Sequence, residues 1–152
     1  MNWYFQRMRG GDQSPPRKPL SKIGWSWLGA FVGIYSITLL NELLNLGEDD
    51  RLFLIGSFGA SAVLIYGAPM AEFSQPRNLV LGHMVSAAVG VIICRIFPDS
   101  VSLAGALAVS IAIVAMHLTR SLHPPGGATA LIAVIGGSKI HGLGYWYLLT
   151  PV

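Results

Sequence analysis

Long apolar runs separated by short polar turns dominate this chain. Three of them, Ile23–Leu46, Leu79–Phe97 and Val101–Leu118, approach or exceed the roughly 20 residues of a helix that crosses a bilayer. Charged residues make up only 11% of the sequence, whereas soluble domains carry roughly a quarter. So few charges cannot cover a soluble domain of 152 residues. The pattern excludes an ordinary cytosolic enzyme, a nucleic-acid-binding module and a disordered chain, and it predicts an all-α integral membrane protein.

Basic residues are concentrated at the start of the chain. Residues 1–22 contain five Lys or Arg residues against one Asp, together with Gly10-Gly11 and Pro15-Pro16. We interpret them as a flexible basic arm, and residues 23–152 as the transmembrane domain. Because loops rich in Lys and Arg stay inside, we expect the N-terminus in the cytoplasm, in a bacterial inner (plasma) membrane. The acidic turn at residues 47–51 then lies outside.

Two other apolar segments are short or interrupted. Leu52–Met70 contains Gly56, Gly59 and Gly67, and Gly126–Gly137 has only 12 residues. We interpret the last segment, Gly144–Val152, as the start of a helix that is truncated in this sequence. The expected fold is therefore about four full transmembrane helices plus two short broken or re-entrant helices.

The two short segments resemble each other. Residues 59–65 parallel residues 127–133 at an offset of 68, which predicts two related halves, about 23–97 and 101–152. If the short helices complete a crossing, the halves are inverted; if they re-enter and return, the halves are parallel. Charge counting slightly favours the inverted repeat, with seven basic residues inside and three outside, against six and four.

The functional prediction rests on short helices that begin inside the membrane. Their first N–H groups lack intrahelical partners, and the helix dipole places roughly half a positive charge there. Because lipid cannot satisfy these groups, they must face protein or a water-filled cavity. We expect two such N-termini to meet and bind a small anion. The expected substrate-binding residues are Ser57, Phe58, Gly59, Ser61, His123, Pro124, Pro125, Gly126, Gly127 and Thr129.

Four further residues are candidates for a pore mouth or path: Arg77, His83, His117 and Arg120. The alternative roles are interfacial anchors for the arginines and satisfied core residues for the histidines. His123 itself could instead be a cap or loop residue. No metal site is expected, since His117, His123 and His141 lack close ligand spacing. The sequence offers no cofactor motif and no catalytic motif, so an enzyme is not expected.

One motif resembles a known family. The run His123-Pro124-Pro125-Gly126-Gly127-Ala128-Thr129-Ala130 is similar to the signature of the HPP family of integral membrane proteins. Residues 57–61, 75–78 and 82–83 are also similar to that family. The resemblance implies a small multi-helix membrane protein, and plant plastid members are associated with nitrite transport.

These observations together predict a membrane transporter or channel for a small monovalent anion, with nitrite as the expected ion. Its partners would be the anion, the lipid bilayer and further copies of the chain, and no nucleic acid. A cation channel and a non-transporting membrane scaffold are the alternatives.

Overall fold

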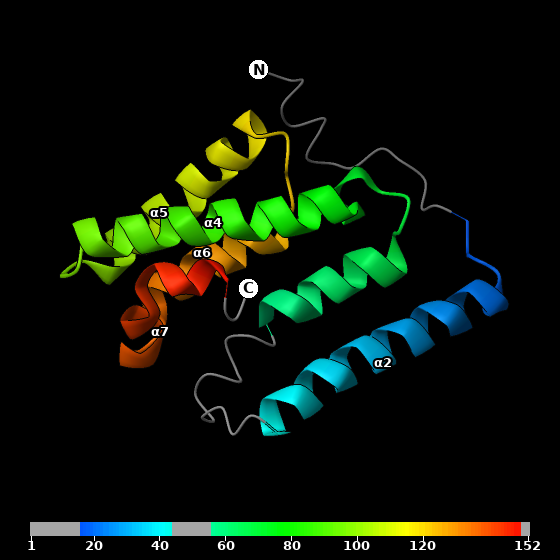
Figure 1. The fold of residues 1–152 in the computed structure, drawn as a ribbon. Helices are drawn as coiled ribbons and strands as arrows, with labels where there is room; N and C mark the ends of the chain where they lie inside the picture. Colours follow the sequence, from blue (N-terminus) through cyan, green and yellow to red (C-terminus); the bar gives the residue numbers. More distant parts are fainter. Residues whose placement is uncertain (1–15, 44–55, 150–152) are drawn as a thin grey trace, which may run out of the picture.

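The computed structural model describes residues 16–43 and 56–149, which form helices joined by short turns (Figure 1). Among these residues, three helices are long and apolar enough to cross a membrane, and two apolar helices are shorter. This confirms the predicted all-α membrane fold, with three full-length helices among these residues where about four were expected. The elements are α2 (Leu20–Leu43), the short helix Gly56–Gly67 with its last turn η1 (Val63–Gly67), η2 (Glu72–Ser74), α4 (Pro76–Ile96), α5 (Val101–Leu118), α6 (Pro125–Ile135), α7 (Ser138–Leu143) and η3 (Gly144–Leu148).

Several boundaries differ from the predicted ones. α2 begins at Leu20, so the arm is shorter than 22 residues. α4 begins at Pro76 inside the predicted polar loop, because proline at the first helical position loses no hydrogen bond. Residues 144–148, predicted as the start of a longer apolar helix, form the short 3-10 helix η3, and α7 precedes them at residues 138–143. Residues 1–15, 44–55 and 150–152 lie outside the described residues, and with them the predicted acidic turn and the first four residues of the predicted segment Leu52–Met70.

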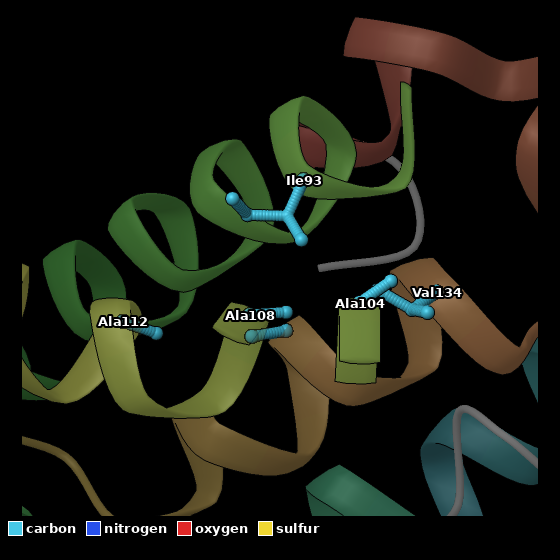
Figure 2. Close-up of a cluster of buried hydrophobic side chains, with 6 residues drawn as sticks. Ile93, Ala104, Ala108, Ala112 and Val134 are labelled. Atoms are coloured by element: carbon cyan, nitrogen blue, oxygen red, sulfur yellow. The ribbon is translucent and has the colours of Figure 1, made fainter. Parts of the chain in front are cut away.

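Small residues pack α4, α5 and α6 closely together. Ala104, Ala108 and Ala112 recur every four residues along α5 and are fully buried. They pack in one cluster with Ile93 of α4 and Val134 of α6 (Figure 2). Membrane helices associate through such small-residue faces, because these let the backbones approach. The three helices therefore form a dense unit with little room for water between them.

α2 lies beside this unit and is attached through the short helix Gly56–Gly67 (Figure 1). The Tyr66 ring lies over Gly29 and Gly33, where an added Cβ would come within 2.6 and 2.7 Å of its atoms. Ser26 Oγ also donates to the Tyr66 carbonyl at 2.6 Å. The pair of glycines in α2 thus accommodates one aromatic side chain.

The two short helices run in opposite directions relative to α4. Along α6, Gly126 lies next to Gly82 and Ala130 lies next to Gly90, so α6 runs parallel to α4. The short helix Gly56–Gly67 is near His83 at Ser61 and then leads through η2 to the start of α4, so it runs antiparallel. If the two halves form an inverted repeat, their short helices must run in opposite directions, as these two do. The repeat itself stays a prediction.

Candidate functional site

Five polar side chains meet inside the bundle. Ser57 and Ser61 come from the short helix Gly56–Gly67, His83 from α4, His123 from the turn before α6, and Thr129 from α6. Each is at most 6% exposed. His83 lies seven residues after Pro76, about 10 Å along α4. The cluster therefore lies within the depth of a membrane-length helix.

The five side chains form one continuous hydrogen-bonded chain. Ser57 Oγ is 2.8 Å from Thr129 Oγ1, which is 2.7 Å from His83 Nδ1. Ser61 Oγ is 3.1 Å from His83 Nε2 and 3.0 Å from His123 Nε2. The chain ends where His123 Nδ1 lies 2.7 Å from the carbonyl oxygen of Phe73.

One arrangement of protons satisfies every ring nitrogen when both histidines are neutral. In it the Ser61 hydroxyl donates to His123 and not to its other acceptor, the Ser57 carbonyl at 3.1 Å. A carbonyl only accepts, so His123 carries its proton on Nδ1 and its Nε2 must accept from Ser61. Ser61 has a single proton, so its oxygen accepts from His83 Nε2–H. His83 Nδ1 then accepts from Thr129, whose oxygen accepts from Ser57. Every donor in this network has an acceptor.

Aromatic and apolar groups enclose the network. The rings of His83 and His123 meet edge to face with centroids 4.9 Å apart, and Phe58 lies 6.3 Å from His83. Beside the network is a cavity of about 430 Å³, which Ser61 and His83 line together with mainly apolar residues of α2, α4, η3 and the short helix. The network is thus in contact with a space large enough for a small solute.

The predicted coordination by free backbone N–H groups is wrong at α6. Gly126 N–H donates to the His123 carbonyl at 2.8 Å, and Gly127 N–H donates to the Pro124 carbonyl at 3.0 Å. Pro125 has no N–H. In the other short helix, Ser61 lies within regular α-helix, where its N–H is used internally. At α6, side-chain hydroxyls and imidazoles are therefore the groups that the site presents.

Close backbone contacts hold the turn that carries His123. A Cβ at Gly82 would lie 2.6 Å from His123 Cβ, and Asn78 Nδ2 donates to the Leu122 carbonyl at 2.9 Å. Arg77 donates to the carbonyls of Arg120 and Thr119 at 2.7 and 3.0 Å. Cations are favourable at the carbonyl end of a helix. This arginine therefore fastens α4 to the end of α5.

The backbone of Arg120 ends helix α5. Its φ of 53° places it in the left-handed region. Its N–H donates to His117, and the Ser121 N–H donates to Met116. These two bonds form a Schellman motif, which ends α5 and turns the chain back toward His123.

The structure brings together some of the predicted site residues and separates others. Ser57, Ser61, His83, His123 and Thr129 form the network, Phe58 packs on it, and the Pro125 carbonyl accepts from Ser57 at 3.2 Å. His117 is exposed on α5 and is not part of the network. Gly59 has open space where a Cβ would be, and Gly127 makes only ordinary contact at 3.8 Å. Pro124 precedes α6 and is exposed.

Sequence reasoning missed several contributors. The Phe73 carbonyl accepts from His123, and Tyr147 Oη donates to the Thr129 carbonyl at 3.0 Å. Ser86 is fully buried, and its hydroxyl has no hydrogen-bond partner among the described residues. A signal was available for α4, where Asn78, Gly82, Ser86 and Gly90 place a small or polar residue at every fourth position.

The fold and this buried polar network define an all-helical integral membrane protein with a polar centre inside its bundle. The model of the HPP transmembrane region matches residues 15–152, and the chain belongs to the HPP family.

Two curated relatives are transmembrane proteins of Dictyostelium discoideum. One is 51% identical over 152 residues, covering 98% of this chain and 48% of the relative. The other is 43% identical over 154 residues, covering 98% of this chain and 53% of the relative. The chain thus spans about half the length of these relatives. No solved structure matches it.

Proposed function

We propose that this protein passes a small monovalent anion across the membrane at the Ser57–His123 network, with nitrite as the first ion to test. One observation carries the proposal: two short helices bring hydroxyls and two imidazoles together beside a cavity, at the depth of a membrane-length helix. Interrupted helices that meet in the membrane interior are typical of transport sites. The choice of nitrite comes from the family resemblance alone. No covalent chemistry is part of the proposal.

The chemistry of the site favours a weakly held small solute. Ser61 and His83 both line the cavity, so a hydroxyl and an imidazole can contact a solute there. No Lys or Arg is among the described residues that line it. A fixed cation would hold an anion tightly, whereas conduction requires release.

Uptake of nitrite into proteoliposomes tests this function. Thr129→Val keeps the shape of the side chain but removes the hydroxyl between Ser57 and His83. We expect uptake to fall about tenfold, which corresponds to about 1.4 kcal/mol, the scale of one hydrogen bond. Thr38→Val on α2 is the matched control, because that hydroxyl bonds only within its own helix.

The alternatives give different results in the same assay. Flux that follows the cation and ignores the anion would indicate a cation channel. Wild-type uptake equal to that of empty vesicles would contradict transport and leave a membrane scaffold as the function.

Orientation and assembly are part of the proposal. Lys18, Arg77 and Arg120 lie at the same end of the bundle, since Lys18 bonds the Gly67 carbonyl and Arg77 bonds the end of α5. We propose that this end faces the cytoplasm, because cytoplasmic loops carry the excess of basic residues. We also propose that copies associate in the membrane, and cross-linking in native membranes tests this.

A further inference from the structure

We propose that the buried network binds one proton, which Ser61 passes between His83 and His123, and that this proton travels with the transported anion. The first part rests on the geometry of the network. The second part rests also on the proposed function. The two parts are tested separately below.

The network has a complete set of hydrogen bonds for an added proton as well as for the neutral state. If His83 gains a proton on Nδ1, this group donates to Thr129, and the Thr129 hydroxyl turns to Ser57. The Ser57 hydroxyl then turns to the Pro125 carbonyl, 3.2 Å away. The proton therefore leaves no buried donor without an acceptor. Buried polar networks are costly only where a group is unsatisfied.

Ser61 lies in position to move this proton from one ring to the other. Its oxygen is 3.1 Å from His83 Nε2 and 3.0 Å from His123 Nε2. The Nε2 proton of charged His83 passes to Ser61 Oγ while the Ser61 hydroxyl proton passes to His123 Nε2. His83 is left neutral with its proton on Nδ1, Ser61 is again a hydroxyl, and His123 is charged. No other reactant is required.

Two observations limit the network to one proton. The ring centroids lie 4.9 Å apart in a buried setting, where two positive charges repel strongly. Among residues 16–43 and 56–149, no buried carboxylate is near to compensate a second charge, and Glu72, on the adjoining η2, is exposed. Other charged or titratable groups on the packed elements contact partners elsewhere: Arg77 bonds the end of α5, Arg95 lies over the Tyr145 ring, Tyr66 packs on α2, and Tyr147 bonds the Thr129 carbonyl.

The cavity explains why the proton and the anion would move together. Its walls are mainly apolar, and a lone anion is expensive to place in such a space. A proton on His83, which lines the cavity, supplies the missing positive charge. The pair of anion and proton is then neutral overall, like the corresponding weak acid.

Nitrogen-15 NMR of the histidines in the lipid-reconstituted protein tests the proton site without any transport. The chain has four histidines, and the variants His117→Gln and His141→Gln assign the two outside the network. At high pH we expect His83 protonated on Nε2 and His123 protonated on Nδ1. On acidification we expect the pair to take up one proton in total, shared between both rings. Two independent titrations would overturn the proposal.

Ser61→Ala tests the relay. We expect the shared titration to separate, so that one ring takes the proton and the other stays neutral. Ser110→Ala is the matched control, because that exposed hydroxyl bonds only within α5. A Ser61→Ala protein in which the two rings still share the proton would overturn the role of Ser61.

Proton movement measured alongside nitrite uptake tests the coupling. We expect one proton to enter with each nitrite, and a His83→Gln variant to lose proton uptake while His117→Gln retains it. Nitrite uptake with no proton movement would overturn the coupling and leave the transport function intact. An absence of nitrite uptake, with the shared NMR titration present, would overturn the proposed function and leave the proton site.

Discussion

At the scale of single residues, glycines at helix contacts set how closely the polar network can assemble. A Cβ at Gly126 would lie 2.6 Å from Ser86 Oγ, 3.0 Å from the Gly82 carbonyl and 3.1 Å from Met116 Sδ. Its neighbour Gly127 has only Val109 at 3.8 Å. The two glycines of the motif therefore have different roles, although the sequence presents them as equivalent.

We expect Gly126→Ala to destabilise the protein by about 1–3 kcal/mol, because overpacking forces α4 and α6 apart. Gly127→Ala is the matched control. It adds the same methyl group in the same helical turn without a clash, and we expect it to be neutral or stabilising by up to about 1 kcal/mol. Melting of the purified proteins in detergent measures both. Equal melting temperatures for the two variants would contradict the tight packing at Gly126.

At the scale of elements, α2 depends on one aromatic contact for its place in the bundle. The Tyr66 ring covers Gly29 and Gly33, and Ser26 bonds the Tyr66 carbonyl. Tyr66 belongs to η1, a π-helical turn, and such turns are often found at functional sites. Movement of α2 would change the cavity, since Gly33, Ile34 and Ile37 line it.

We expect Gly29→Val to weaken the attachment of α2 by about 1–3 kcal/mol, because an added Cβ would lie 2.6 Å from the Tyr66 ring. Gly24→Val is the control, since no described atom outside its own helix lies within 4 Å of an added Cβ there, and the change in helix propensity is the same. Spin-label distances between α2 and the short helix Gly56–Gly67 provide the measurement. A distance unchanged by Gly29→Val would show that other contacts hold α2.

At the scale of the whole molecule, α4 separates two ends that differ in the number of basic residues. Lys18, Arg77 and Arg120 lie around its start with Glu72, whereas Arg95, Lys139 and Asp99 lie around its end. If α4 crosses the membrane, these two groups face opposite sides. From the distribution of Lys and Arg, we expect the end with more basic residues to face the cytoplasm.

Single cysteines test this topology. In a Cys94→Ala background, which removes the only native thiol, we expect Glu72→Cys to react with an impermeant thiol reagent from the cytoplasmic side alone. Asp99→Cys should react from the opposite side alone. Labelling of both from one side would show that α4 does not cross, and reversed labelling would place the basic end outside.

The sequence by itself determined the membrane class, the range of α5, the break before Pro125 and the family motif. These depend on local properties: the length of apolar runs, proline geometry and residue order. Only the tertiary structure distinguished His83 from His117, because both lie in apolar runs and only packing decides which one is enclosed. The tertiary structure also showed that side chains, and not the backbone N–H groups of Gly126 and Gly127, form the polar site. Those N–H groups already donate to the carbonyls of His123 and Pro124. A hydrogen-bonded network among three helical segments depends on contacts between residues far apart in the chain, and residue order alone does not specify such contacts.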